Sequence, residues 1–303
     1  MITPPYLKKG DTIGMVCPSG FMAYEKAQTA ITVLQEWGFK VKTGATLGSD
    51  SKNYFSGTDE ERLDDLQQMM DDDSVNAVMC ARGGYGMSRI IDKISFKKFK
   101  KHPKWIIGFS DITVLQCHLL SVYKIASLHA PMAAAFNDPD SQGKNEFIES
   151  LHSALLGGKA TYTCASNSFN TTGNAKGRLV GGNLSLLAHI TGTASGISTK
   201  NKILFIEDVG EYIYNVDRML YQLQRSGQLE KLSGLIVGGF TEIKDTTTPF
   251  GQTVEEVIRD RVKGYDYPVC FNFPVSHEKE NYALKIGVRY KLIVAEKVTL
   301  EEC

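Results

Sequence analysis

The chain has 303 residues, enough to bury a large core and to form two domains. Its 42% hydrophobic and 22% charged residues are ordinary for a soluble globular protein. Because 34 basic residues balance 34 acidic ones, the formal net charge is +0, and charge gives no reason to expect a nucleic acid as partner.

Short apolar runs alternate with helical patterns in the first half of the chain. The pattern predicts strands in DTIGMV (11–16), FKVKTG (39–44), VNAVMC (75–80) and KWIIGFS (104–110), and helices over 24–37, 58–70 and 111–124. The helix over 58–70 begins with a capping box formed by Thr58 and Glu61. Strands that alternate with helices favour an α/β fold with a doubly wound, mostly parallel sheet.

The composition changes near residue 157. Residues 157–177 are rich in Gly, Ser, Thr and Asn, which is typical of a linker. Beyond it come apolar segments over 177–193, 202–212, 232–240 and 268–277, helices near 216–226 and 254–263, and strands separated by short turns over 282–301. We therefore expect an N-terminal domain over 1–157, a linker over 158–177 and a β-rich C-terminal domain over 178–303.

The six cysteines are scattered and form no C-x-x-C pair, which favours reduced thiols in a cytoplasmic protein. Residues 1–20 lack the long apolar segment of a secretory signal, and no stretch reaches the length of a membrane span. No histidines or cysteines have the spacing of zinc ligands. We expect no metal, no cofactor and no membrane partner.

The stretch GFSD (108–111) ends an apolar strand with Ser110 and Asp111. Ser110 is either the N-cap of the following helix or a nucleophile held on a strand-to-helix turn. Ile112 stands where the last glycine of a G-x-S-x-G motif would be, which argues against a typical α/β-hydrolase.

The loop ARGGYG (81–86) also follows a predicted strand. It lacks the G-x-G-x-x-G pattern and the Gly-Lys-Ser/Thr ending of phosphate-binding loops. Its consecutive glycines suit either a tight turn or backbone N–H groups that approach a reacting oxygen, as in an oxyanion hole.

Two further polar turns follow apolar strands in the second half. ILFIEDVGE (203–211) ends with Glu207, Asp208 and Glu211, and FPVSHEKEN (273–281) contains His277, which is either a surface residue or a base. His118, His129 and His189 lie in or beside apolar segments and are read as structural. A serine nucleophile needs a base, and that base needs a carboxylate, so the residue types of a triad are present.

Taken together, RGGYG (82–86), GFSDIT (108–113), LVGGNL (179–184), FIEDVGE (205–211) and SHEKENYALKIG (276–287) resemble the LD-carboxypeptidase family, the murein tetrapeptide carboxypeptidases. The resemblance runs from about Gly10 to about Val294. Ser276 and Lys285 depart from the family pattern, which expects glycine and proline there, and this puts loop geometry in question more than chemistry.

The resemblance implies a Ser-His-Glu peptidase with an α/β N-terminal domain and a β-rich C-terminal domain, commonly a homodimer. It implies Ser110 as nucleophile, His277 as general base and Glu207 as its orienting carboxylate, with the backbone N–H groups of Gly84 and Asp111 as the oxyanion hole. The implied substrate is a cytoplasmic murein tetrapeptide of peptidoglycan recycling, from which the terminal D-alanine is removed. The candidates for substrate binding are Arg82, Arg178 and Asn183.

Two other functions are compatible with these residues. A relative of the microcin self-immunity proteins would cleave a peptidyl-nucleotide antibiotic, and aromatic residues in the C-terminal domain that stack on a base would favour it. Trp37 and Trp105, the two tryptophans, both fall in the N-terminal half. A binding module without enzymatic activity is the third possibility, and the presence of Ser110, His277 and Glu207 speaks against it.

Overall fold

The computed structural model describes residues 1–139 and 143–303, which divide into two compact units. Unit 1 comprises Met1–Gly158 and Tyr282–Lys285, and unit 2 comprises Lys159–Asn281 and Ile286–Cys303. No helix in these described ranges is both long and apolar enough to cross a membrane.

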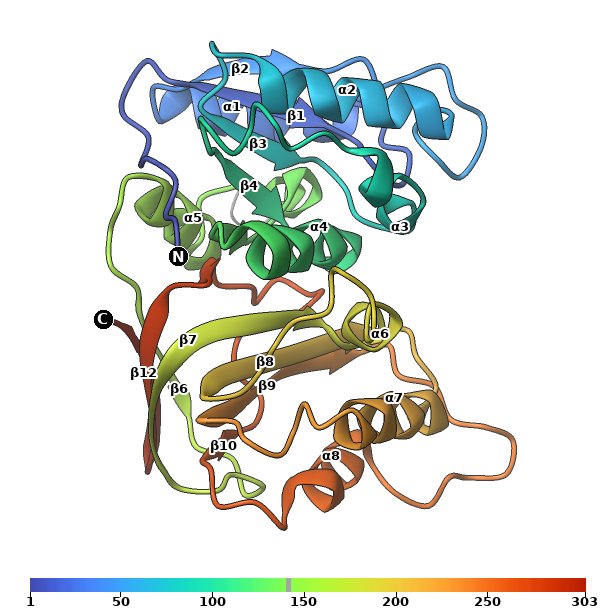
Figure 1. Cartoon of the computed structure of the whole chain (residues 1–303), viewed down its shortest axis with the longest axis vertical. Helices are drawn as coiled ribbons and strands as arrows, with labels where there is room; N and C mark the ends of the chain where they lie inside the picture. Colours follow the sequence, from blue (N-terminus) through green and yellow to red (C-terminus); the bar gives the residue numbers. More distant parts are fainter. Residues whose placement is uncertain (140–142) are drawn as a thin grey trace. The chain divides into compact units, whose positions relative to one another are not determined.

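Unit 1 is built on a six-stranded sheet with the order β11-β5-β4-β3-β1-β2. Figure 1 labels β1 to β4 of this sheet. Its strands are β1 (Thr12–Val16), β2 (Lys40–Thr43), β3 (Ala77–Cys80), β4 (Trp105–Gly108), β5 (Ser127–His129) and β11 (Leu284–Ile286). Strands β1 to β5 pair in parallel. The chain runs outward from β1 to β2 and then returns past β1 to β3, so the winding direction reverses between β1 and β3. Ligands bind at such a reversal in doubly wound sheets.

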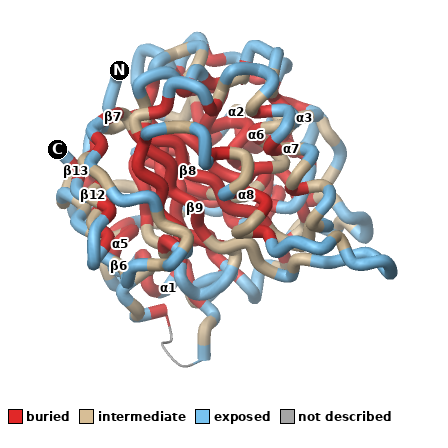
Figure 2. The backbone as a smooth tube through the Cα atoms, turned by 90° about the horizontal axis from the view of Figure 1, so that it is seen from below, coloured by how far each residue is buried: buried red, intermediate tan, exposed pale blue. Residues whose placement is uncertain are grey.

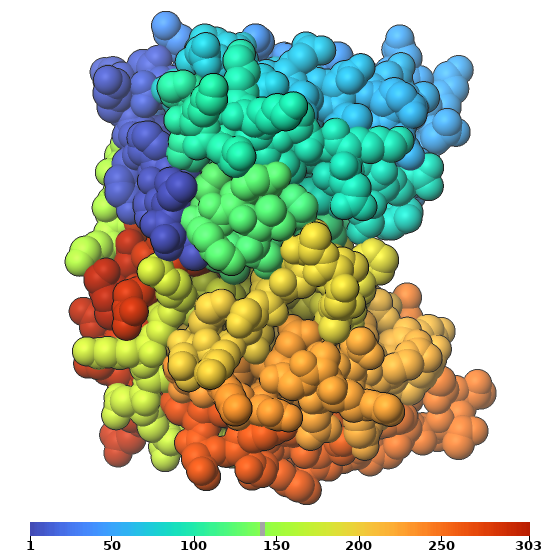
Figure 3. All heavy atoms as spheres, in the orientation of Figure 1, coloured from blue at the N-terminus to red at the C-terminus, as the bar shows by residue number. Residues whose placement is uncertain are grey.

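The connections of unit 1 are helical. They are η1 (Tyr24–Ala27), α1 (Gln28–Glu36), α2 (Asp59–Asp71), α3 (Met87–Ile90), η2 (Ile91–Lys93), η3 (Ser110–Ile112), α4 (Thr113–His118), η4 (Leu119–Tyr123), η5 (Ala133–Asn137) and α5 (Glu146–Leu155). The predicted capping box of α2 is confirmed, because the Thr58 side chain and the Glu61 side chain each bond the other residue's backbone N–H. In Figure 3 the N-terminal residues lie against the segment after α4, where the Ile2 N–H donates to the Lys124 carbonyl.

Unit 2 contains a seven-stranded sheet with the order β10-β9-β8-β7-β12-β13-β6. Its strands are β6 (Thr161–Ala165), β7 (Gly173–Asn183), β8 (Lys202–Val209), β9 (Gly234–Thr241), β10 (Val269–Cys270), β12 (Arg289–Val294) and β13 (Lys297–Glu302). The half from β7 to β10 is parallel and the half from β7 to β6 is antiparallel. The helices are α6 (Leu184–His189), α7 (Ile213–Arg225) and α8 (Val254–Val262). Figure 2 shows β8 and β9 as largely buried strands.

The expected fold class is confirmed, since both units combine sheets with helices and the N-terminal sheet is doubly wound. The segment 158–177 differs from the expected linker, because it contains β6 and the beginning of β7. At least one glycine of this segment is used for packing. A Cβ atom at Gly177 would lie 3.2 Å from the Asn201 carbonyl oxygen and from the Ile203 nitrogen, so glycine lets β8 approach β7 closely.

Candidate active site

Ser110 lies directly after β4, at the beginning of the short turn η3. Its φ of 61° places a residue with a side chain in the left-handed region, which costs about 1–2 kcal/mol relative to the right-handed one. The N-cap of η3 is Phe109, without a side-chain cap bond, and the hydroxyl of Ser110 forms no hydrogen bond with any described residue. The N-cap interpretation therefore has no support in the geometry. A strained serine on a strand-to-helix turn is typical of a functional position.

The glycine loop after β3 lies against Ser110. A Cβ atom at Gly83 would lie 2.9 Å from the Ser110 Cβ and 3.1 Å from its Oγ, so only glycine permits this approach. The next residue, Gly84, is exposed and has a φ of 99°, and its backbone N–H donates no hydrogen bond within the described chain. Gly84 therefore follows the glycine that contacts Ser110, and its N–H is an available donor. Sequence reasoning identified Gly84 but missed the contact made by Gly83.

Asp111 follows Ser110 and has two separate features. Its backbone belongs to the turn η3, where its N–H is the second candidate donor for an oxyanion. Its side chain is 1% exposed and accepts hydrogen bonds from the Ser19 hydroxyl at 2.5 Å and the Met87 N–H at 2.8 Å. Ser19 and Met87 were not singled out in the sequence, because nothing local in CPSG or GYGM indicates a shared partner.

In unit 2, Glu207 and His277 form a close pair. The Oε2 atom of Glu207 lies 2.6 Å from Nδ1 of His277. Glu207 is completely buried near the carboxyl end of β8, and His277 is partly buried in the segment after β10. A Cβ atom at Gly238 in β9 would lie 3.2 Å from the Glu207 Cβ and 2.2 Å from the Val275 carbonyl oxygen. Glycine at this position thus lets the histidine segment pack beside the end of β8.

The environment of this pair favours a charged histidine. Burial alone would lower the pKa of His277, but its hydrogen bond with Glu207 and the charges of Glu207, Asp208 and Glu242 outweigh burial, so the pKa lies above its ordinary value. The other Glu207 oxygen, Oε1, is buried and accepts no hydrogen bond from the described residues. The carboxylate is therefore directed mainly at the histidine, as in a pair in which an acid orients a base.

The two other carboxylates of FIEDVGE have separate partners. Asp208 accepts hydrogen bonds from the Asn183 amide and from the Ser185 N–H, both at 2.9 Å. Burial, with the adjacent charge of Glu207, raises the pKa of Asp208 to about 7. Glu211 accepts a hydrogen bond at 2.9 Å from the side chain of Asn215 in α7. Of the three, Glu207 is the one that contacts His277.

The three candidates for substrate binding occupy different settings. Arg82 is exposed in the glycine loop and donates to the Phe21 carbonyl. Asn183 is buried and caps α6, where its side-chain oxygen accepts from the Leu186 N–H and its amide bonds Asp208. Arg178 donates to the Gly287 carbonyl at 2.9 Å. In the register of β7 and β8, Asn183 is the residue opposite Glu207. Arg178 lies five residues before Asn183, which is about 16 Å along a strand.

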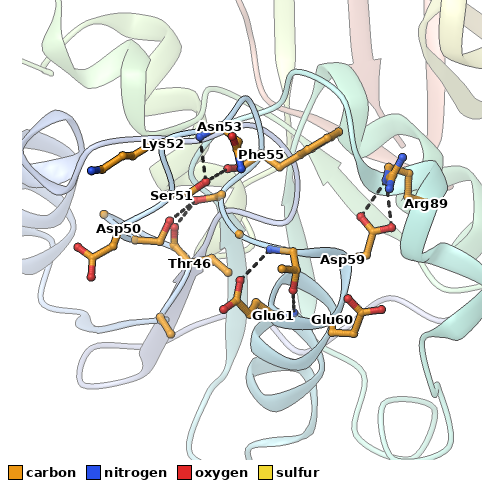
Figure 4. A pocket seen from close by; sticks show the side chains of 16 residues that line it. Thr46, Asp50, Ser51, Lys52, Asn53, Phe55, Asp59, Glu60, Glu61 and Arg89 are labelled. Carbon is orange, nitrogen blue, oxygen red and sulfur yellow. Dashed lines mark hydrogen bonds and ion pairs between the residues drawn. The ribbon is translucent and has the colours of Figure 1, made fainter.

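Unit 1 also has a pocket whose lining includes none of these residues. It measures about 940 Å³ and is lined by the loop after β2 and the beginning of α2, including Ser51, Lys52 and Asp59 (Figure 4). Among the described residues, no group of three or more His, Cys, Asp or Glu side chains is arranged to hold a metal ion. We therefore take two groups as the candidate catalytic residues. They are Ser110 with its glycine loop in unit 1 and the His277–Glu207 pair in unit 2.

Comparison with known proteins identifies the family of the chain. Residues 13–130 match the LD-carboxypeptidase N-terminal domain and residues 176–292 match the LD-carboxypeptidase C-terminal domain. A probable murein peptide carboxypeptidase of Bacillus subtilis is 35% identical over 99% of this chain and 94% of its own length.

A muramoyltetrapeptide carboxypeptidase structure from Oxalobacter formigenes superposes with a TM-score of 0.85 at 29% identity, covering 96% of this chain and 98% of that one. The microcin C7 self-immunity protein MccF of Escherichia coli is 25% identical over 93% of this chain and 90% of its own length. The matches support a serine-type carboxypeptidase. The chain belongs to the LD-carboxypeptidase family.

Proposed function

We propose that this protein is a serine carboxypeptidase that removes the terminal D-alanine from murein tetrapeptides. The observation that carries the proposal is the 2.6 Å contact between His277 and Glu207, because it supplies an oriented base of the kind a serine nucleophile requires. The strained turn of Ser110 and the names of the relatives support the same conclusion. We further propose that the protein acts in the cytoplasm, in peptidoglycan recycling, as a homodimer.

In the proposed mechanism, the Ser110 Oγ attacks the carbonyl carbon that precedes the terminal D-alanine, and His277 takes the hydroxyl proton. The backbone N–H groups of Gly84 and Asp111 stabilise the resulting oxyanion. The tetrahedral intermediate then collapses: the C–N bond breaks, and His277 gives its proton to the departing amine of D-alanine. Water attacks the acyl-enzyme with the same proton relay and releases the tripeptide. Glu207 keeps the proton of neutral His277 on Nδ1 and stabilises the imidazolium form.

The direct test uses L-Ala-D-Glu-diaminopimelate-D-Ala, with D-alanine and tripeptide followed by mass spectrometry. We expect equimolar release of both products. The same peptide ending in L-alanine, or in D-alanine amide, serves as the matched control and should react far more slowly. Equal turnover of the L-alanine peptide would exclude a carboxypeptidase specific for an L–D junction.

A second candidate function is the hydrolysis of a peptidyl-nucleotide, as in the microcin immunity relative. The observation that favours it is a pair of exposed tyrosines, Tyr212 and Tyr214, whose rings stack at 5.5 Å at the beginning of α7. Such rings offer a surface for a base. The two tryptophans belong to unit 1, and Trp105 is buried there. An aspartyl sulfamoyl adenosine competitor separates the two functions: inhibition of tetrapeptide hydrolysis that disappears in Tyr212→Ala would favour the nucleotide function.

A module that only binds a small ligand makes a different prediction. A fluorophosphonate forms a bond between serine Oγ and phosphorus and releases fluoride, but only where a base activates the hydroxyl. Intact mass after incubation should show one adduct per chain, absent from Ser110→Ala. A chain that stays unlabelled would favour the binding module.

A further inference from the structure

Three loops of unit 1 share one buried carboxylate. The Oδ2 atom of Asp111, in the turn after β4, accepts from the Ser19 hydroxyl at 2.5 Å and from the Met87 N–H at 2.8 Å. Ser19 belongs to the turn after β1, and Met87 directly follows the glycine loop after β3. One oxygen atom therefore joins the turns that follow β1, β3 and β4. This is the region where the winding direction of the sheet reverses.

A buried arginine holds two of the same loops. Arg62 of α2 is 0% exposed and donates from Nη1 to the carbonyl oxygens of Pro18 at 2.5 Å and Gly86 at 3.2 Å. Nη2 of Arg62 forms an ion pair with Asp59. Asp59 also forms an ion pair with Arg89 at 2.8 Å, which Figure 4 shows. The positive charge of Arg62 and the negative charge of Asp111 interact favourably. The carboxyl-terminal end of the glycine loop is thus held by two buried charged groups, Arg62 at Gly86 and Asp111 at Met87.

The backbone conformation of the glycine loop is tightly constrained. Gly84 and Gly86 have φ values of 99° and 150°, which side-chain-bearing residues rarely adopt. A Cβ atom at Gly86 would lie 2.7 Å from the Arg62 Nη1 and 3.1 Å from the Ser19 Cα. The loop therefore fits tightly between Arg62 and the turn after β1, and Asp111 holds it at Met87.

We propose that the carboxylate of Asp111 is a positioning residue for the oxyanion hole. It fixes the loop that carries the Gly84 N–H relative to Ser110, while the backbone N–H of the same residue is the second donor. The inference rests on the proposed function. It matters for rate, because donors must already be aimed at the oxygen where charge develops, and a small displacement removes most of their effect.

The decisive variant is Asp111→Asn, which keeps the size of the side chain but removes its charge and one acceptor oxygen. We expect kcat for the tetrapeptide to fall about 100-fold, as when one oxyanion donor is lost, with KM within about threefold of wild type. The rate of fluorophosphonate labelling at Ser110 should fall by a similar factor, since its phosphoryl oxygen uses the same donors. A purely structural role would lower only the folded fraction and the melting temperature.

Asp65→Asn is the matched control. Asp65 is also a buried aspartate of unit 1, 6% exposed, and accepts from the backbone N–H groups of Ala45 and Thr46 at 3.0 and 2.9 Å, in a loop that carries no proposed catalytic group. Its variant should lose stability but keep kcat and the labelling rate within about twofold. Ser19→Ala, which removes the hydroxyl donor to the Asp111 carboxylate, should lower both rates about fivefold.

The outcomes separate this inference from the proposed function. If wild-type protein neither hydrolyses the tetrapeptide nor reacts with the fluorophosphonate, the proposed function fails, and this inference fails with it. If wild type is active and Asp111→Asn keeps both rates within threefold, the proposed function stands and the inference is wrong. If Asp111→Asn does not fold, Ser19→Ala decides: unchanged rates in that variant overturn the inference.

Discussion

Nδ1 of His277 and Oε2 of Glu207 lie 2.6 Å apart, although the two residues are separated by 70 positions in the chain. The contact joins the segment after β10 to the end of β8. A carboxylate at Nδ1 keeps the proton of neutral histidine on that atom, which makes Nε2 the basic nitrogen. The pair thus sets both the tautomer and the basicity of the imidazole, and each property leads to a measurable consequence.

The pH profile of the rate should reflect the raised pKa of His277. A general base must be neutral, and its folded-state pKa lies above the ordinary value of 6.5, so kcat/KM should fall on the acidic side with an inflection above pH 6.5. Removing the negative charge in Glu207→Gln lowers the pKa, so the inflection of the remaining activity should move to lower pH. The measurement is kcat/KM between pH 5 and 9 for both proteins. An inflection below pH 6 in the wild type would contradict the assignment of His277 as base.

Ser110→Ala should abolish turnover and leave the fold intact. Removal of a triad serine leaves only the catalysis of binding and the oxyanion hole, a loss of roughly 10⁴- to 10⁶-fold. The alternative role as a helix cap predicts nearly normal turnover with about 1 kcal/mol of lost stability. Rate and thermal melt of the purified variant decide, and activity within tenfold of wild type would refute the nucleophile.

Ser110→Gly tests the strain at this position independently. Both variants lack the hydroxyl, but glycine adopts the φ of 61° without the steric cost that alanine keeps. After allowance for the greater freedom of glycine in the unfolded chain, we expect Ser110→Gly to be about 0.5 kcal/mol more stable than Ser110→Ala. The two free energies of unfolding can be compared by denaturant titration. A less stable glycine variant would mean that the turn stores no strain.

Recognition of the terminal carboxylate should depend on Arg82 more than on Arg178. Arg82 is exposed two residues before Gly84, whereas Arg178 lies in the half of β7 remote from Asn183 and Glu207. Loss of a hydrogen bond to a charged group costs about 1.5–3 kcal/mol, so Arg82→Ala should raise KM for the free acid roughly 10- to 100-fold. It should change KM for the D-alanine amide much less. Arg178→Ala should leave both KM values near wild type, and the opposite pattern would assign the carboxylate to Arg178.

The sequence predicted features that depend on local pattern. Periodicity and the Thr58–Glu61 capping box located α2, and apolar runs ending in polar turns located the ends of β4 and β8. Neighbouring strand residues point to opposite faces, which agrees with the separate partners of Glu207 and Asp208 at the end of β8. These features need no knowledge of distant residues.

The features that the sequence missed depend on contacts between distant residues. No local signal shows that Arg62 is buried beneath the glycine loop or that the Asp111 carboxylate binds Ser19. The composition of β6 predicts a linker, because β6 is an edge strand with alternating exposure and its threonines resemble those of a loop. Gly177, which looks like a loop glycine, is required because β8 passes close to its Cα.

Two variants in FIEDVGE decide which carboxylate orients His277. Glu207→Gln keeps the size of the side chain and its contact with His277, but the neutral amide neither holds the tautomer nor steadies the forming imidazolium. By analogy with other triads, turnover should fall roughly 10⁴-fold. Glu211→Gln is the matched control, since Glu211 bonds Asn215 rather than the histidine, and a glutamine oxygen can still accept that hydrogen bond. It should cost far less, mainly in stability, as thermal melts of both variants will show. An active Glu207→Gln beside an inactive Glu211→Gln would make Glu211 the orienting acid and would mean that the 2.6 Å contact does not serve catalysis.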